Sequence, residues 1–450
     1  MKNAPKKRER KTMNNIIVIG GGFAGVEAAH QLSKQGFKVS LYEMKPNRFS
    51  PAHSKETLAE LVCSNSFKAL RTASAAGTLK AEMEFFDSIC VRCAKATAVP
   101  AGGALAVDRD KFSEMVTAEI EADPNITLIR EELTDIPEDA YVVVAAGPLA
   151  SDAIAEKIDK LCPGHLSFYD AAAPIVTAES LDMDCAFTQS RYERGGDDDY
   201  INCPLHKEEY EHFYDELINA ESAPTHSFDK RKGVYEGCMP IEVMATRGHD
   251  TIRFGPMKPV GLRDPRTGHR PWAVLQLRKE NADGSLFNLV GFQTNLKFGE
   301  QKRVFSMIPA LKNAEFVRYG VMHRNTFINS PKLLDADFSL RSNHNIYFAG
   351  QITGVEGYME SASAGILAGL NLARRIKDEE PLVLPEDTMM GALSRYISDE
   401  TVENFQPMGA NFGILPPLPE RIKSKQERYE QISERALNSL KDFLKNKEVL

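Results

Sequence analysis

Short apolar runs alternate with segments of helical periodicity at the start of the chain. Residues 15–19, NIIVI, form a β-branched run typical of a buried strand, and residues 26–36 repeat apolar positions at helical spacing. Residues 38–44, KVSLYEM, predict a second strand, and the glycine-rich segment 20–25, GGGFAG, lies between the first strand and the helix. This order of strand, glycine turn, helix and strand predicts a βαβ unit that binds a dinucleotide.

The glycines of this segment have the spacing of the dinucleotide fingerprint. Gly20 permits the tight turn, Gly22 lets the backbone approach a pyrophosphate, and Gly25 lets helix and strand pack closely. Glu43 ends the second strand, 18 residues after Gly25, where an acidic side chain binds a ribose hydroxyl. The residues predicted to bind the cofactor here are Gly20, Gly21, Gly22, Phe23, Ala24, Gly25 and Glu43.

Two later segments favour FAD over NAD as the dinucleotide. Residues 141–150, YVVVAAGPLA, predict a buried strand, and residues 345–376 predict a strand, a glycine turn and a helix of small residues. This layout resembles FAD proteins of the glutathione-reductase type, in which a C-terminal strand and helix return to the flavin. Gly350 and Gly354 are therefore added to the predicted cofactor site.

These elements predict an α/β fold: a glutathione-reductase-type FAD-binding Rossmann domain with an inserted α/β domain and a helical C-terminus. The expected boundaries are 1–12 for a disordered tail, 13–155 for the first part of the FAD domain, 160–325 for the inserted domain that faces substrate and RNA, 326–380 for the returning segment and 381–450 for the helical C-terminal segment. Residues 81–96 are expected to form one helix.

Composition limits the class of protein further. Hydrophobic residues make up 42% and charged residues 26% of the chain, as in globular proteins. No apolar run approaches the ~18–20 residues that span a membrane, and the basic N-terminus lacks the apolar core of a secretory signal. Seven scattered cysteines favour a reducing cytoplasm. Cys90 and Cys93 form a lone CxxC that predicts two packed thiols, and no metal site is expected.

The net charge of −8 argues against a uniformly basic nucleic-acid binder, but the charge is uneven. Residues 247–278 hold seven Lys/Arg against two Asp, and residues 297–324 hold six Lys/Arg against two Glu. A local basic face of this kind can bind RNA phosphates. From charge alone, a solvated surface is an equal alternative.

Two cysteines stand in polar turns: Cys63 in LVCSNS and Cys238 in YEGCMPIEVM. Together with GGGFAGVEAA, VPAGGALAVDR, FYDAAAPIV, FGPMKPVGL, GFQTNLKFGEQ, RYGVMHRNTFINSP, FAGQITGVEGYMESA and NFQPMGANFG, these motifs resemble the flavin- and folate-dependent tRNA (uracil-5-)-methyltransferases. The resemblance covers essentially residues 13–430, with Phe23 where many relatives carry Leu.

The resemblance implies a reaction and its partners. The methylene group of 5,10-methylenetetrahydrofolate would be transferred to uracil C5 in the tRNA T-loop, at position 54. FAD would supply the reducing equivalents that turn methylene into methyl, and NAD(P)H would reduce the FAD again. The protein is expected to act in the cytoplasm without a membrane, as a monomer or a homodimer.

A reactive thiol suits this chemistry, because thiolate addition at C6 makes uracil C5 a carbon nucleophile. A Gly-Cys-Met-Pro turn exposes a thiol, so Cys238 is assigned the attack on C6, with Arg247 and Arg253 as cations that offset the neighbouring acids. Cys63 is assigned proton removal from C5 or gating of the nucleophile. The resemblance supports both cysteines but leaves the division of roles open.

Other candidates are less determined. Tyr358, in GVEGYMES, stacks on the flavin or the base, donates a proton, or is a packed aromatic residue. His323, Arg324 and Asn325 are weaker candidates for holding folate or flavin. The predicted RNA-binding residues are Arg247, Arg253, Arg263, Arg266 and Arg270.

Three alternatives remain open at this point. The first is the same chemistry on a uridine of 23S ribosomal RNA. The second is the related FAD protein that modifies wobble uridines, which is longer and carries a C-terminal helical domain. The third is a flavin-bearing RNA chaperone or scaffold without turnover, which the two cysteines in polar turns disfavour.

Overall fold

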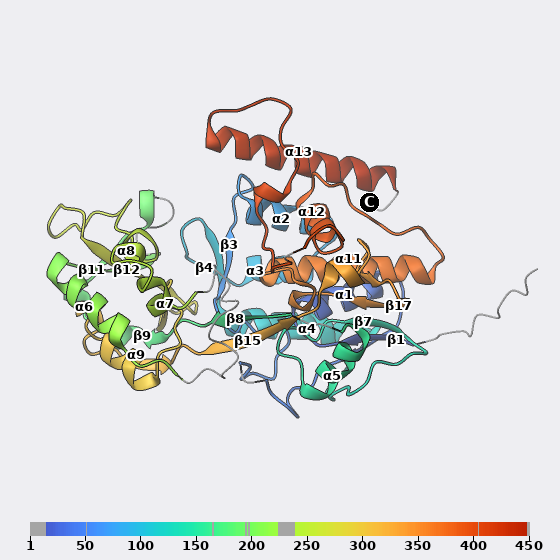
Figure 1. Ribbon diagram of the computed structural model, residues 1–450, viewed down its shortest axis with the longest axis horizontal. Helices are drawn as coiled ribbons and strands as arrows, with labels where there is room; N and C mark the ends of the chain where they lie inside the picture. Colours follow the sequence, from blue (N-terminus) through green and yellow to red (C-terminus); the bar gives the residue numbers. More distant parts are fainter. Residues whose placement is uncertain are drawn as a thin grey trace, which may run out of the picture.

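The computed structural model describes residues 15–50, 52–163, 166–193, 196, 199–223, 239–403 and 405–447, with the backbone alone at 166–170, 323 and 324. The expected tail at 1–12 and Cys238 lie outside this part of the chain. Figure 1 shows two lobes joined by a narrow connection.

The larger lobe is built on a six-stranded sheet in the order β16-β17-β7-β1-β2-β6. Five strands run parallel, and β16 is the antiparallel edge. Their bounds are β1 Ile16–Ile19, β2 Val39–Tyr42, β6 Ile126–Ile129, β7 Tyr141–Val144, β16 Ser339–Leu340 and β17 Asn343–Phe348. Strand β1 is buried along its whole length, as its uninterrupted apolar sequence requires between two neighbouring strands and two covering layers.

Two helices that are distant in sequence cross closely over this sheet. They are α1 (Phe23–Lys34) and α11 (Tyr358–Ile376). A Cβ atom at Gly365 would lie 2.1 Å from the carbonyl oxygen of Ala24, and one at Gly369 would lie 2.7 Å from that of Ala28. The small residues of α11 therefore allow its backbone to touch the backbone of the cofactor-binding helix, which brings the returning segment to the glycine-rich loop.

The smaller lobe has its own antiparallel sheet and its own apolar core. The strand order is β10-β11-β12-β13-β9-β14. The strands are β9 Ile175–Thr177, β10 Phe187–Thr188, β11 Tyr200–Leu205, β12 Ala273–Lys279, β13 Leu286–Leu289 and β14 Phe316–Arg318. The helices of this lobe are α6 Lys207–Asn219, α7 Ile241–Ala245, α8 Thr251–Phe254 and α9 Phe298–Phe305 (Figure 1).

An antiparallel ribbon, β8 (Leu166–Ala171) with β15 (Met322–Phe327), runs between the lobes (Figure 1). Beside it lies a three-stranded sheet of β3 (Ser66–Ala69), β5 (Ala104–Val107) and β4 (Ala98–Val99). The chain thus crosses between the lobes twice, once at β8 and once at β15, which are far apart in the sequence.

Helices complete the larger lobe. Those that precede the inserted lobe are α2 Ala75–Glu84, α3 Ile89–Ala96, α4 Arg109–Ala122 and α5 Asp152–Leu161, and those that follow it are α10 Ser330–Leu333, α12 Met389–Tyr396 and α13 Lys425–Asn446. Helix α13 lies across α2 and α12 (Figure 1), where Thr78 Oγ1 donates to Ser433 Oγ at 3.0 Å. No helix among the described residues is long and apolar enough to cross a membrane.

The predicted fold class is confirmed, because a parallel Rossmann-type sheet, an inserted second sheet and C-terminal helices are all present. The expectation of a single helix over 81–96 is wrong. Asp87 has a φ of 57°, which breaks the helix, and Ser88 caps a new one by accepting from the N–H of Val91. Apolar periodicity continues across the break, so it does not reveal the turn.

Candidate active site

A cavity of about 160 Å³ lies at the carboxyl ends of β1, β2 and β7, where open parallel sheets bind ligands. The predicted cofactor residues that line it are Gly20, Gly21, Gly22, Phe23, Ala24, Glu43 and Gly350. Gly25 and Gly354 do not line it. Gly25 packs behind the loop, and a Cβ at Gly354 would lie 2.4 Å from the Phe405 ring.

The three fingerprint glycines differ in what surrounds them. Gly20 has a φ of +101°, and a Cβ there would lie 2.5 Å from the Ala145 carbonyl oxygen. A Cβ at Gly25 would lie 1.8 Å from the Gly20 carbonyl oxygen. A Cβ at Gly22 would meet nothing within 4 Å. Gly20 and Gly25 are therefore required by the protein's own packing, whereas the space at Gly22 is open toward a ligand.

The cavity fits the diphosphate of a dinucleotide. Helix α1 begins at Phe23, and its N-cap residue Gly22 has no side chain to bind the first N–H groups, which are left for a ligand. No acidic residue stands in the first turn to repel an anion. The buried carboxylate of Glu43 accepts from the N–H groups of Gly21 at 2.9 Å and Lys45 at 3.0 Å, so it also fixes the glycine-rich loop.

A second cavity, of about 530 Å³, lies where the lobes meet. It shares Val62, Pro148, Leu149, Gln351 and Tyr358 with the first cavity, so the two adjoin. Cys63 and Tyr358 lie on the side of the larger lobe, and the smaller lobe supplies Met244, Pro256, Asn288, Val290 and Gln293. A ligand in this cavity contacts both lobes.

Cys63 and Tyr358 form a hydrogen-bonded pair in this second cavity. The Cys63 Sγ atom lies 3.0 Å from the Tyr358 hydroxyl, and the N–H groups of Val62 and Cys63 each donate to the same hydroxyl at 3.0 Å. With both lone pairs of the phenol accepting, its one proton is directed to the sulfur. A donor to sulfur favours the thiolate over the thiol.

Tyr358 is held as a neutral phenol. Burial raises its pKa well above the usual value, and the adjacent Cys63 raises it further. Its ring stacks on Phe23, with 4.8 Å between ring centroids and 30° between planes. Phe23 also lines the first cavity, so the Tyr358 side chain joins the glycine-rich loop to Cys63.

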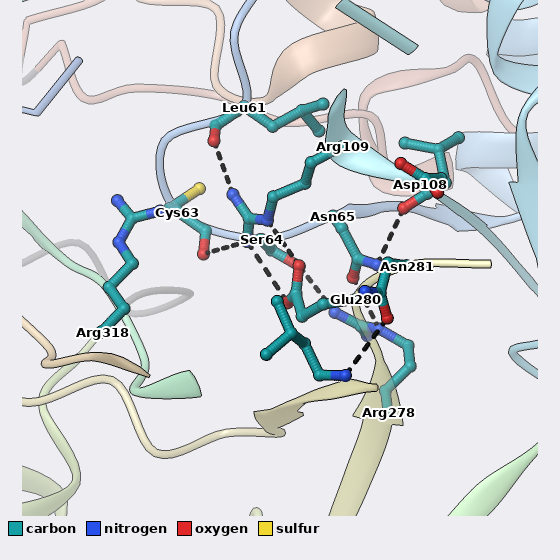
Figure 2. Close-up of polar contacts among 12 residues, drawn as sticks. Leu61, Cys63, Ser64, Asn65, Asp108, Arg109, Arg278, Glu280, Asn281 and Arg318 are labelled. Carbon is teal, nitrogen blue, oxygen red and sulfur yellow. Dashed lines mark hydrogen bonds and ion pairs between the residues drawn. The ribbon is translucent and has the colours of Figure 1, made fainter. Parts of the chain in front are cut away.

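Arginines surround the backbone of the Cys63 segment, with Arg109 and Arg318 on different sides of it (Figure 2). Arg109, near the start of α4, donates to the carbonyl oxygens of Leu61 at 2.5 Å and Cys63 at 3.1 Å. Arg318, from β14, donates to the carbonyl of Val62 at 2.6 Å. The segment 61–63 has no regular secondary structure, so its backbone carbonyl groups accept hydrogen bonds from arginine side chains instead. These bonds allow the irregular segment to remain partly buried.

The smaller lobe holds the same segment through Arg278, on β12. Its guanidinium donates to Asn65 Oδ1 and Ser64 Oγ, both at 2.9 Å. Asn65 in turn donates to the Lys279 carbonyl at 2.9 Å. Glu280 forms an ion pair with Arg109 at 2.5 Å, which closes the network across the two lobes (Figure 2).

The five predicted RNA-binding arginines lie on one stretch of the smaller lobe but differ in their contacts. Arg247, Arg263 and Arg270 are exposed. Arg253 stacks on Trp272, 3.8 Å from the ring centroid. Arg266 is paired with the buried carboxylate of Asp264 at 2.7 Å, so part of its charge is already compensated.

Cys238, the predicted nucleophile, lies outside the described residues, as do its neighbours back to 224. Met239, the next described residue in the sequence, is buried and lines the second cavity. The side chains of His323 and Arg324 are not described, whereas Asn325 is buried and lines the same cavity.

Sequence reasoning did not single out Arg109, Arg278 or Glu280. Arg278 was counted in a basic run taken as a candidate surface, yet its side chain is buried. A charged residue on a largely apolar strand, as in AVLQLRK at 273–279, is the signal that was available, because such a residue needs a buried partner.

Comparison with known proteins gives a consistent set of relatives. The family model described as "Glucose inhibited division protein A" matches residues 15–380. A protein of Acetivibrio thermocellus named methylenetetrahydrofolate--tRNA-(uracil-5-)-methyltransferase TrmFO is 57% identical over 430 residues, covering 95% of this chain and 98% of the relative. A Desulfitobacterium hafniense protein of the same name is 55% identical, covering 96% and 98%.

Among solved structures, GidA of Aquifex aeolicus in its form II crystal superposes with a TM-score of 0.68 at 16% identity. The match covers 96% of this chain but 74% of the GidA chain. This likeness shows a shared fold. The difference in length separates the two proteins, because the relatives from Acetivibrio and Desulfitobacterium are matched along almost their whole length.

Proposed function

The chain belongs to the family of methylenetetrahydrofolate--tRNA-(uracil-5-)-methyltransferases named TrmFO, and we propose that it methylates C5 of a uridine in the tRNA T-loop, at position 54. The carbon comes from 5,10-methylenetetrahydrofolate. Support comes from one observation above all: Cys63, bonded to Tyr358, lines a cavity that adjoins the dinucleotide cavity. The thiol of Cys63 thus lies in a ligand cavity that is directly adjacent to the dinucleotide cavity.

The thiolate of Cys238 adds to uracil C6 and forms a carbon–sulfur bond, which makes C5 nucleophilic. C5 attacks the methylene carbon of the folate, which is bonded to two folate nitrogens. One of these carbon–nitrogen bonds breaks as C5 attacks, and the second breaks when the carbon is reduced to methyl. Met239, next to Cys238 in the sequence, lines the cavity where we place this reaction. Arg247 and Arg253 are the cations that we assign to offset the acidic neighbours of Cys238.

Cys63 removes the C5 proton, after which the bond between C6 and the Cys238 sulfur breaks and the ring regains its double bond. The hydrogen bond from Tyr358 favours the thiolate of Cys63, which is the form that accepts a proton. Tyr358 itself stays protonated because its pKa is raised by burial and by Cys63. It acts as a donor that orients the base.

Bound FAD, when reduced, supplies the hydride that turns the transferred methylene into methyl, and NAD(P)H reduces it again. The residues that would hold its diphosphate are Gly20, Gly21 and Gly22 with the N-terminus of α1. We assign Glu43, which lines the same cavity, to a ribose hydroxyl. Phe23 and Gly350 line the same cavity. The products are 5-methyluridine and tetrahydrofolate.

The target uridine must leave its loop to reach a cavity of this kind. We place the RNA on the smaller lobe, where Arg247, Arg263 and Arg270 are exposed. Phosphate contacts there would position the RNA without reading its sequence. The reaction then takes place in the cytoplasm, where tRNA is found.

The test uses purified protein loaded with FAD, reduced with NADPH under low oxygen and supplied with 5,10-methylenetetrahydrofolate. Unmodified tRNA and unmodified 23S ribosomal RNA are incubated separately, digested and analysed for 5-methyluridine by mass spectrometry. We expect product in tRNA, within the T-loop. Product in ribosomal RNA alone would keep the chemistry and move the substrate, and product in neither would overturn the proposal.

A further inference from the structure

Three side-chain amides line the second cavity. They are Asn288 on β13, Gln293 in the turn that follows and Asn325 on β15. The Nδ2 atom of Asn288 is buried and has no hydrogen-bond acceptor within the described part of the chain. Asn288 and Asn325 are 3% and 4% exposed, whereas Gln293 is half-buried.

Outside this cavity, the buried amides in the described part of the chain are bonded to protein groups. Asn202, also in the smaller lobe, donates to the carbonyls of Phe187 and Gln189 and accepts from Gln276 at 2.9 Å. A buried amide without a partner carries a desolvation cost. The Asn288 amide nitrogen is therefore in the state expected of a group whose partner is a ligand.

The rest of the wall indicates the shape of that ligand. Met239, Met244, Pro256 and Val290 give the cavity apolar surfaces, which pack against the faces of a flat ring. A carboxamide offers one donor and one acceptor side by side. This pattern complements a ring that carries an N–H next to a C=O, the lactam edge.

We propose that Asn288, assisted by Gln293 and Asn325, binds the lactam edge of a heterocyclic ring in the second cavity. The terminal torsion of an Asn side chain is broad, so the amide turns its oxygen or nitrogen to the ring at low cost. The inference rests on the proposed function only for the ligand's source, because uracil, the pterin of folate and the flavin ring all carry this edge.

The test is a change of preference produced by Asn288→Asp in the FAD-loaded protein. A carboxylate accepts at both oxygens, so it favours a ring with an amino group in place of the ring carbonyl. One arm compares the dissociation constants of tetrahydrofolate and its 4-amino analogue. A second compares a T-arm RNA that carries uridine at the target with one that carries cytidine. A third measures the FAD content of each preparation.

We expect the preference between paired probes to shift by about tenfold or more in one arm. A shift in the folate arm assigns the edge to the pterin, a shift in the RNA arm assigns it to uracil, and loss of FAD assigns it to the flavin. Unchanged values in all three arms would overturn the inference.

A second variant separates recognition from folding. Asn288→Leu has nearly the same shape and removes no hydrogen bond, so we expect no fall in the melting temperature before ligand is added, and weaker binding of the assigned probe. The matched variant Asn202→Leu removes bonded groups and should melt lower while keeping the probe preference. Absence of methylation by the wild-type protein would count against the proposed function alone, since the binding arms do not require turnover.

Discussion

Arg109 and Glu280 are 171 positions apart in the sequence and form an ion pair at the junction of the lobes. Glu280 is 3% exposed and the Arg109 side chain 13% exposed. Burial alone would lower the pKa of Arg109, but the pairing with Glu280 raises it above the usual value, so the guanidinium remains charged. The same guanidinium holds the carbonyl groups of Leu61 and Cys63. The position of the Cys63 segment therefore depends on the contact between the lobes.

We expect Glu280→Gln to lower stability and to alter the reactivity of Cys63. The variant leaves a buried cation without its counter-charge, which costs about 3 kcal/mol or more. The measurements are the melting temperature of the FAD-loaded protein and the rate at which iodoacetamide modifies Cys63, followed by mass spectrometry of its peptide.

The matched control is Glu216→Gln. Glu216 pairs with Arg303 on the surface of the smaller lobe, where an exposed ion pair contributes less than about 1 kcal/mol. The control should leave both measurements close to those of the wild-type protein. An unchanged Cys63 modification rate in Glu280→Gln would show that the ion pair does not position this segment.

Gly22 and Gly25 should respond differently to substitution. Because a Cβ at Gly22 meets nothing within 4 Å, we expect Gly22→Val to fold and to be purified without FAD. A Cβ at Gly25 would lie 1.8 Å from a backbone oxygen, so Gly25→Val should yield little folded protein. Circular dichroism and the flavin absorbance of the purified proteins check both expectations. Normal FAD content in Gly22→Val would show that this loop does not bind the cofactor.

Tyr358→Phe removes the hydroxyl and keeps the ring that stacks on Phe23. We expect FAD to be retained and methylation to fall by about tenfold or more, because the hydrogen bond to the Cys63 sulfur is lost. Since the pKa of Tyr358 is raised well above its usual value, its ionisation does not enter below pH 10. The pH profile of the rate should therefore keep both of its limbs in the variant. A profile that loses a limb would mean that Tyr358 titrates during turnover.

The larger lobe was predictable because its information is local. The segment 15–44 places strand, glycines, helix and acid within one short stretch. Gly20 and Gly25 are required by close backbone packing, and Gly22 leaves space for a ligand. The small residues of α11 indicated close packing in the same way. Local patterns of this kind carry most of the fold.

The network around Cys63 was not predictable for the opposite reason. Arg109, Arg278 and Arg318 come from three separate elements, and of the three only Arg278, on a largely apolar strand, has a sequence context that indicates burial. Their shared target, the carbonyl groups near Cys63, is a backbone feature that no residue type reveals. Contacts that depend on the approach of two lobes are absent from any local pattern.

The exposed arginines of the smaller lobe should contribute to RNA affinity. We expect Arg263→Glu with Arg270→Glu to weaken tRNA binding, and the dependence of log affinity on log salt to become shallower, because fewer counterions are released. Lys38→Glu, an exposed residue of the larger lobe, is the control. Arg266 is avoided because it pairs with Asp264. Filter-retention measurements of tRNA binding at several salt concentrations check this expectation. An unchanged slope of log affinity against log salt would mean that the RNA binds to another surface.

Glu27 gives a prediction about pH. It lies fully buried in α1, and burial raises its pKa from 4.5 to about 7. In the unfolded chain it ionises near pH 4.5, so the folded state loses stability as the pH rises from about 4.5 to about 7, by roughly 3 kcal/mol in total. Above that range the loss is complete and constant.

Glu27→Gln removes the ionisation and can still accept from Ser88 and the N–H of Cys90 through its remaining oxygen. We therefore expect the variant to gain melting temperature relative to the wild-type protein as the pH is raised from 5 to 8. Glu82, whose pKa burial raises to about 8, is present in both proteins and cancels in the difference. A difference that stays constant from pH 5 to 8 would mean that Glu27 does not titrate in the folded state over this range.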